Sequence, residues 1–394
     1  MILPVSKRMA SVKPSPTGAV LALAAELRAA GRDVISLGAG EPDFDTPVHI
    51  REAAIAAING GQTRYTPIDG TAELKAAIQA KFSRENKLDY ELSQIVVTCG
   101  AKQALFNLCI ALLNPGDQAI IPAPYWVSYP DMVRLAGAEP VVLESGIEQD
   151  FKITPEQLAE AISEQTRLLI LNNPSNPTGT CYAAAELAAL GEIVEQHPNI
   201  VVLSDDIYEH IHWAPDPFVS FATACPSLMD RTITANGVSK AYAMTGWRIG
   251  YAAGPQALIT AMKTVQSQST TNACSVSQAA AVAALNGDQA CIREMASAYH
   301  ERHEYIVAAL NEIDGFECRH GEGAFYAFPR VQAALESKGL KDDNEFVEFL
   351  LNEADVACVP GSAFGAPGYV RFSFACSMET LEESVRRIKR ALMA

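Results

Sequence analysis

Short apolar runs alternate with longer segments of helical periodicity over the first two thirds of the chain. The runs are apolar almost throughout, which is typical of strands that are covered on both faces of a sheet. This alternation predicts βα units around a mostly parallel sheet, and so an α/β fold. The predicted strands are Ile95–Thr98, Ala119–Pro122, Pro140–Leu143, Arg167–Leu171, Ile200–Ser204, Thr232–Ala235 and Ile249–Ala253.

Several helix starts are marked by capping patterns. Thr154-Pro-Glu-Gln157 reads as a capping box with proline at the first helical position, and Thr380-Leu-Glu-Glu383 reads as a second box. Beyond about residue 285 the pattern predicts a long charged helix from Gln289 to about Ile313. In the α+β tail that follows, Lys341-Asp342-Asp343 reads as a solvated turn before a helix that starts near Asn344.

A chain of 394 residues is too long for one compact core and predicts two domains. We interpret residues 47–287 as a large α/β domain. Residues 13–46, together with residues 288–394, would form a smaller domain, and residues 1–12 would form an N-terminal arm.

Composition narrows the class of protein. A net charge of −16 argues against a nucleic-acid partner, although it leaves room for a local basic pocket. No apolar run approaches the roughly 20 residues that span a bilayer, and the N-terminus shows no signal peptide. The nine cysteines form no Cys-x-x-Cys pair, which favours free thiols in a reducing compartment, without a zinc site or a disulfide. We therefore expect a cytoplasmic enzyme with no membrane partner.

The richest chemical signal is the stretch from Gly237 to Tyr251, which holds Lys240 and Arg248 among apolar and small residues. Burial lowers the pKa of a lysine towards the neutral amine, the form that condenses with an aldehyde. A guanidinium suits a phosphate. The pair therefore predicts a site for pyridoxal 5′-phosphate (PLP), with the aldehyde at Lys240 and the phosphate at Arg248. A surface loop with both side chains solvated is the alternative.

The continuation Gly-Trp-Arg-Ile-Gly argues against that alternative. The stretch resembles the cofactor-lysine segment of fold-type I PLP enzymes, specifically class I aminotransferases of the aspartate type. The resemblance runs from about residue 13 to about residue 376. It implies a large domain with a mostly parallel central sheet and a smaller α+β domain. It also implies a homodimer with shared active sites.

Polar residues follow several predicted strands, where ligands of open α/β sheets gather. Asp205 could pair with the protonated pyridine nitrogen of PLP, although a helix N-cap role is the alternative and Asp206 competes with it. The Asp-x-x-Tyr spacing of the resembled family selects Asp205. The resemblance further implies that Tyr208, and Asn176 in its Asn-Pro-Thr-Gly sequence, bond to the phenolate oxygen of PLP.

The segment Thr98–Ala104 lies between a strand and an apolar helix, where backbone N–H groups attract phosphate. With Arg248 as partner, Gly100, Ala101 and Lys102 form a candidate phosphate cradle. In the resembled family, a lysine at the position of Lys102 reads the distal carboxylate of the substrate. An exposed lysine at a helix start is the alternative.

Four further residues take their roles from the same resemblance. Trp126 would stack on the PLP ring, and Tyr65 would reach the phosphate from the neighbouring subunit. Arg371 lies in an apolar strand pattern and would bind the substrate α-carboxylate through two parallel bonds. The backbone of Gly40, alternatively a turn glycine, would assist it. Lys102, Trp126 and Asn176 complete the expected substrate site.

Two departures from the animal-type pattern affect selectivity. Gly237 stands where some relatives carry a phosphate-binding serine, and Ser239 would compensate. The segment Gln266–Ala273 holds no arginine to read a distal carboxylate. Selectivity for acidic substrates would then rest on Lys102, aided by Lys13 or Thr17 closing over the site. These departures match the bacterial subgroup that includes prephenate aminotransferases.

The combined prediction is a ping-pong transamination between L-aspartate or glutamate and a 2-oxo acid such as 2-oxoglutarate. Prephenate is a further candidate acceptor. Lys240 would move the proton from the substrate Cα to C4′ of the cofactor. The alternatives are another fold-type I enzyme, such as a C–S lyase or an aromatic or alanine aminotransferase, and the ligand-sensing module of a transcription regulator. Only about a dozen residues precede the resemblance, which disfavours the regulator.

Overall fold

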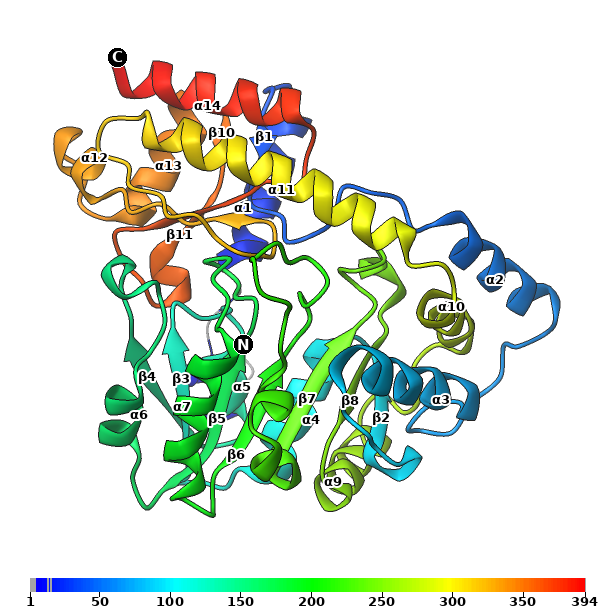
Figure 1. The fold of residues 1–394 in the computed structure, drawn as a ribbon. Helices are drawn as coiled ribbons and strands as arrows, with labels where there is room; N and C mark the ends of the chain where they lie inside the picture. Colours follow the sequence, from blue (N-terminus) through cyan, green and yellow to red (C-terminus); the bar gives the residue numbers. More distant parts are fainter. Residues whose placement is uncertain (1–4, 13, 15, 394) are drawn as a thin grey trace.

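The computed structural model describes residues 5–12, 14 and 16–393 (Figure 1). All seven predicted strands are present, and they form one sheet in the order β2-β8-β7-β6-β5-β3-β4. β8 runs antiparallel to both of its neighbours, β2 and β7, and the other pairs in this sheet are parallel, so the predicted mostly parallel α/β sheet is confirmed. The strands are β2 (Ile95–Thr98), β3 (Gln118–Ala123), β4 (Glu139–Glu144), β5 (Thr166–Asn172), β6 (Val201–Asp205), β7 (Thr232–Gly237) and β8 (Gly250–Ala253).

Helices cover both faces of this sheet, which explains why its strands are continuous apolar runs. In β5, Leu168 and Ile170 face one buried cluster, whereas Leu169 and Leu171 face another. The first cluster includes α4 (Ala101–Leu112), α5 (Tyr129–Leu135) and α9 (Gln256–Ser267). The second includes α6 (Pro155–Ala161), α7 (Ala184–Glu195) and α8 (Phe221–Ala224).

A third cluster packs beside β2 and β8, at the edge of the sheet. It is built from α2 (Val48–Asn59), α3 (Ala72–Lys81) and α10 (Ser275–Asn286), with Ile95, Val97 and Tyr251 from the strands. Figure 1 shows these three helices together on one side of the molecule. Helices that are far apart in the sequence thereby pack together against one edge of the large sheet.

The C-terminal part, residues 290–393, forms a separate layer above the carboxyl end of the sheet (Figure 1). Its long helix α11 runs from Ala290 to Asn311, close to the predicted bounds. A small antiparallel sheet in the order β11-β12-β9 packs with the helices on a shared apolar core. The remaining elements of this part are β9 (Tyr326–Ala327), α12 (Gln332–Ser337), α13 (Asp343–Glu353), β10 (Val356–Ala357), β11 (Val359–Pro360), β12 (Val370–Ser373) and α14 (Met378–Met393).

The N-terminal segment joins this C-terminal part. α1 (Pro16–Ala29) contributes Ala24 to a core shared with Leu351, and β1 (Ile35–Ser36) pairs in parallel with β10. These contacts support the domain division that we propose, in which residues 13–46 belong with 288–394 and residues 47–287 form the large domain.

The capping predictions had mixed outcomes. Thr154 and Gln157 form the predicted box, because each side chain accepts from the backbone N–H of the other residue. The box at Thr380 was wrong. α14 already begins at Met378, and Ser377 accepts the N–H of Thr380 at 3.2 Å, so that Thr380 lies inside the helix.

The predicted turn before α13 also needs correction. Asp342 caps the helix as a turn residue would, accepting from the N–H groups of Asn344 and Glu345. Asp343, however, is buried rather than solvated, because its carboxylate accepts from the N–H of Ser362 at 2.6 Å.

The remaining global predictions concern cysteines and membranes. All nine cysteines carry free thiols. No helix in the described part of the chain combines the length and the apolar character that crossing a membrane requires.

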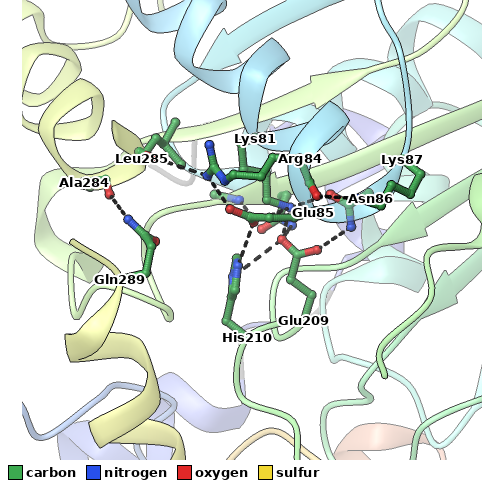
Figure 2. A network of polar contacts seen from close by, with 12 residues as sticks. Lys81, Arg84, Glu85, Asn86, Lys87, Glu209, His210, Ala284, Leu285 and Gln289 are labelled. Carbon is green, nitrogen blue, oxygen red and sulfur yellow. Dashed lines mark hydrogen bonds and ion pairs between the residues drawn. The ribbon is translucent and has the colours of Figure 1, made fainter. Parts of the chain in front are cut away.

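A buried ion pair ties α3 to the segment after β6 (Figure 2). The Lys81 ammonium contacts the Glu209 carboxylate and donates to Asn86 Oδ1 at 2.7 Å. Glu209 also accepts from the side-chain amides of Asn86 and Asn236, each at 2.7 Å. Burial alone would raise the pKa of Glu209, but the charge of Lys81 offsets burial and the pKa is lowered.

Removing the ammonium should therefore be costly. We expect Lys81→Ala to lower the free energy of unfolding by about 3–5 kcal/mol, because it leaves a buried carboxylate without its cation. The measurement is the midpoint of urea denaturation. Lys341→Ala, which removes an exposed lysine, is the control and should change stability by less than about 0.5 kcal/mol. Equal midpoints for the two variants would contradict the role of the pair.

Candidate functional site

A cavity of about 520 Å³ lies at the carboxyl edge of the large sheet, beneath the C-terminal part. The parallel register explains why its side chains converge, since Asn172 in β5 lies beside Asp205 in β6, which pairs with Ala235 in β7. Most of the predicted site residues line this cavity. They are Gly40, Ala101, Lys102, Trp126, Asn176, Asp205, Tyr208, Ser239, Lys240, Arg248 and Arg371.

Lys240 follows the end of β7 and reaches into the cavity. Its ammonium donates to the carbonyl oxygen of Gly40. Burial lowers its pKa to about 8, with opposing effects from Glu41 and Asp205 and further lowering from the two arginines of the cavity. A much larger share of this amine is therefore neutral at pH 7 than in an ordinary lysine.

Asp205 ends β6 and is buried. Burial raises its pKa to about 6, against the opposing hydrogen bond from Tyr129 Oη, 2.6 Å from the carboxylate. Asp206 does not line the cavity; its carboxylate accepts from Ser204 Oγ at 2.6 Å. The geometry thus favours Asp205 over Asp206 as the carboxylate that meets a ligand.

Arg248 lies against the start of α4, next to Gly100. A Cβ at Gly100, whose φ is +77°, would lie 2.4 Å from Arg248 Nη2, so a glycine is needed for the guanidinium to approach this closely. The hydrogen bonds of Arg248 go to the carbonyl oxygens of Thr245 (3.0 Å) and Cys99 (3.5 Å). The guanidinium and the N–H groups of the helix start therefore offer donors of the kind that an anion requires.

The departure at Gly237 has a steric reason. A Cβ there would lie 2.9 Å from the carbonyl oxygen of Ile249, just before β8, so a serine would not fit without a shift. Ser239 lines the cavity two residues later.

Arg371 lies in β12 and is almost completely buried. Its guanidinium donates to Asn176 Oδ1 (2.9 Å) and to the carbonyl oxygen of Gly38 (2.8 Å), and stacks 4.4 Å from the ring centre of Tyr326. Its Nε has no partner among the described residues, and burial lowers its pKa. A buried cation with only neutral partners favours an anionic ligand.

Residues 32–388 match the family described as Aminotransferase class I and II. The chain belongs to this family. It is 53% identical over 393 residues to an aspartate/prephenate aminotransferase of Nitrosomonas europaea, covering 98% of this chain and 99% of the relative. It is 50% identical to an aspartate aminotransferase of Bacillus subtilis, covering 98% of both chains.

Solved structures agree with these relatives. The aspartate aminotransferase from Rhizobium meliloti matches with a TM-score of 0.96 and 48% identity, covering 99% of both chains. The Thermus thermophilus aspartate aminotransferase with maleate matches with a TM-score of 0.93 and 42% identity, covering 99% of this chain and 100% of that chain. The fold-type I prediction is thereby confirmed.

Members of the aminotransferase family are PLP enzymes, and the cavity fits this cofactor. An amine of lowered pKa suits the aldehyde, and the guanidinium at the start of α4 suits the phosphate. A buried carboxylate at a strand end suits a protonated ring nitrogen. Each of these groups faces one cavity, so a single ligand could meet all of them.

Sequence reasoning missed three residues of this aminotransferase site. Tyr129 donates to Asp205, and Glu41 lines the cavity near Lys240. Tyr326 Oη lies 2.8 Å from Tyr208 Oη, and burial raises the pKa of both phenols. Tyr326 lies 118 residues from Tyr208 in the sequence, and no local sequence pattern indicates a contact between residues so far apart.

Lys102 and Trp126 meet at the cavity wall. Lys102 Nζ lies 4.7 Å from the ring centre of Trp126. Partial burial lowers the pKa of Lys102, and the charge of Arg248 lowers it further. Lys102 is exposed to solvent, as the alternative reading expected, and also lines the cavity.

Gly100, which lies against the Arg248 guanidinium, and Tyr65 are the predicted site residues in the described part of the chain that do not line the cavity. Tyr65 is 90% exposed and lies outside it. Lys13 lies outside the described residues, whereas Thr17, at the start of α1, does line the cavity.

The raised pKa of Asp205 predicts pH-dependent cofactor binding. The carboxylate is ionised above about pH 6 and neutral below it, so the affinity of the apoprotein for PLP should fall as the pH drops through about 6. One linked proton weakens binding by at most about tenfold per pH unit. The measurement is an absorbance titration of apoprotein with PLP between pH 5 and pH 8.

The adjacent aspartates supply matched controls. Asp205→Asn should lose this component of the pH dependence, and Asp206→Asn should retain it. A profile that Asp206→Asn flattens and Asp205→Asn leaves intact would assign the titrating group to Asp206 instead.

Proposed function

We propose that this aminotransferase moves the amino group between L-aspartate, or glutamate, and a 2-oxo acid such as 2-oxoglutarate by a ping-pong mechanism. Prephenate is a further acceptor in this proposal. The observation that carries it is the convergence of Lys240, Asp205 and Arg371 on one cavity. Relatives named for aspartate and prephenate support the choice of substrates.

When bound, PLP supplies an electron sink that stabilises negative charge at the substrate Cα. Arg371 would bind the α-carboxylate through two parallel bonds and so orient the Cα–H bond towards Lys240. The lowered pKa of Lys240 keeps part of its amine neutral, which lets it accept the proton from Cα. Asp205 would hold the proton on the pyridine nitrogen.

We propose the remaining contacts to the cofactor from the resemblance to the family, and the places of these residues in or beside the cavity support them. Gly100, Ala101 and Arg248 would hold the phosphate, with Ser239 beside them. Trp126 would stack on the ring, and Tyr208 and Asn176 would bond to its phenolate oxygen.

We further propose that Lys102 binds the distal carboxylate of a dicarboxylic substrate. Lys102 is an exposed cation that lines the cavity, and Thr17 lines the same cavity from α1. The Thermus thermophilus relative was solved with maleate, a four-carbon dicarboxylate, which supports an acidic substrate for this chain.

A homodimer is part of the proposal. The exposed Tyr65 would reach the phosphate bound by a second copy of the chain, so each cavity would be completed by its partner. The 90% exposure of this tyrosine leaves its ring available for such a contact.

Replacing Lys240 tests the proposed reaction. Lys240→Ala should lower kcat for aspartate and 2-oxoglutarate by at least about 10⁴-fold, because the proton acceptor is lost. Lys240→Arg keeps the positive charge without a neutral amine and should be equally inactive.

Wild-type holoenzyme given L-aspartate alone should change its cofactor absorption and release oxaloacetate. An elimination enzyme would instead convert L-cysteine, given without a 2-oxo acid, into pyruvate, ammonia and hydrogen sulfide. Robust turnover by either Lys240 variant would overturn the assignment.

Replacing Lys102 tests acidic selectivity. We expect Lys102→Met to lower kcat/KM for aspartate by about 10- to 100-fold, the worth of one hydrogen bond to a charged group. Alanine has no distal carboxylate, so its kcat/KM should stay nearly unchanged. Steady-state kinetics with both amino acids gives the comparison, and an equal loss for the two substrates would contradict this role.

A further inference from the structure

Tyr326 contacts two residues of the cavity that come from different parts of the fold. It lies in β9 of the C-terminal part, is almost completely buried and lines the cavity. Its hydroxyl oxygen lies 2.8 Å from that of Tyr208, which follows β6 of the large sheet. The guanidinium carbon of Arg371, in β12, lies over its ring at 4.4 Å from the ring centre. One side chain therefore joins the other two.

The small antiparallel sheet explains why Tyr326 and Arg371 meet. Tyr326 in β9 pairs with Ser373 in β12, two residues after Arg371. Residues two apart on a strand share a face, and diagonal neighbours on antiparallel strands are within reach of aromatic and long side chains. The ring and the guanidinium therefore extend from the same face of this sheet.

Aromatic rings hold the guanidinium of Arg371. The ring centre of Phe364 lies 4.9 Å from the guanidinium carbon, in addition to the ring of Tyr326. A cation is attracted to the face of an aromatic ring, and more strongly where water is excluded. The hydrogen bonds of Arg371 to Asn176 and Gly38 use Nη1 and Nη2, whereas the rings contact the plane of the group. The Tyr326 ring therefore helps to fix the plane in which Arg371 can meet a carboxylate.

The hydroxyl of Tyr326 would act on Tyr208. A phenol has a single proton to donate. When Tyr208 gives its proton to the phenolate oxygen of a bound cofactor, the hydrogen bond between the two phenols requires Tyr326 as its donor. A hydroxyl that accepts a hydrogen bond becomes a stronger donor, because the two bonds polarise each other. Tyr326 would thus strengthen the bond that Tyr208 donates.

Gly40 leaves space for this phenol. A Cβ at Gly40 would lie 2.7 Å from Tyr326 Oη. Gly40 has no positive φ, so this close contact accounts for the glycine better than a turn conformation does. The carbonyl oxygen of the same residue accepts from the Lys240 ammonium. The tip of the phenol therefore lies against the segment that also meets Lys240.

We propose that Tyr326 is a positioning residue of this aminotransferase. Its ring fixes the plane of the Arg371 guanidinium, and its hydroxyl directs the proton of Tyr208 towards the cofactor. The inference rests on the proposed function, which assigns Arg371 to the substrate α-carboxylate and Tyr208 to the phenolate oxygen of PLP. Tyr326 would hold these two contacts in a fixed relation to each other.

Removing the hydroxyl alone tests its effect on Tyr208. Bound PLP changes its absorption when it loses a proton, and a hydrogen bond to its phenolate oxygen stabilises the form without that proton. Tyr326→Phe should raise the pH midpoint of this change by roughly 0.3–0.6 unit, because the Tyr208 bond becomes weaker. Tyr208→Phe should raise the midpoint by about 1–2 units, because that bond is lost. Both variants keep Arg371, Asp205 and Lys240, the charged groups near the two phenols.

The double variant distinguishes this role from a general effect on the structure. In a Tyr208→Phe background, Tyr326→Phe should leave the midpoint unchanged, because the group through which it acts is absent. Tyr305→Phe removes a phenol hydroxyl from α11, outside the cavity, and should match the wild type. An unchanged midpoint in Tyr326→Phe, or an equal shift in both backgrounds, would overturn the proposal.

Maleate, a dicarboxylate, tests the role of the ring. Calorimetric titration of PLP-loaded protein with maleate measures how well Arg371 meets a carboxylate. Tyr326→Leu removes the ring and should weaken binding by about 3- to 30-fold. Tyr326→Phe keeps the ring and should stay within about twofold of the wild type. Equal affinities of Tyr326→Leu and the wild type would contradict the seating of Arg371 on this ring.

The wild type separates this inference from the proposed function. A wild type that holds no PLP, or that does not bind maleate, would overturn the proposed function and this inference with it. A wild type with both properties, together with Tyr326 variants that match it, would overturn the inference alone.

Discussion

The site depends on holding three cations around one cavity without bonding any of them to a carboxylate of the described chain. Lys240 donates to a backbone carbonyl, Arg248 to two carbonyls, and Arg371 to an amide oxygen and a carbonyl. Arg371 is buried, whereas Arg248 is exposed, and neutral partners recover only part of the hydration that a buried charge such as that of Arg371 loses. Lys81 differs from these three cations, because its ammonium is paired with the carboxylate of Glu209. The phosphate of a cofactor and the carboxylate of a substrate would supply the negative charges that these cations lack in the fold.

The backbone makes this arrangement possible. Neighbouring parallel strands end at one edge of the sheet, which brings Asn172, Asp205 and Ala235 into line. At the same edge, Gly100 lacks the Cβ that would collide with Arg248. Arg371 arrives from the other direction, on a strand of the C-terminal part. The cavity is therefore a product of how the two parts pack.

The features that could be predicted from the sequence are those with a local cause. Continuous apolar runs predicted all seven strands of the sheet, and Thr154 with Gln157 predicted a helix start. The error at Thr380 arose because two capping hydroxyls lie three residues apart, and Ser377 begins the helix earlier. Tyr129 and Tyr326 depend on contacts between distant segments, so no local pattern marks them. The role of Tyr65 depends on a second chain.

The electrostatics of Lys240 join binding to chemistry. Part of the lowering of its pKa comes from the charges of Arg371 and Arg248. A phosphate at Arg248 and a substrate carboxylate at Arg371 would neutralise those charges and remove that part. The pKa of the amine would then rise towards its ordinary value. A higher pKa makes the neutral amine a stronger base but leaves a smaller neutral fraction at pH 7, so the bound anions would change both quantities in opposite directions at the group that accepts the Cα proton.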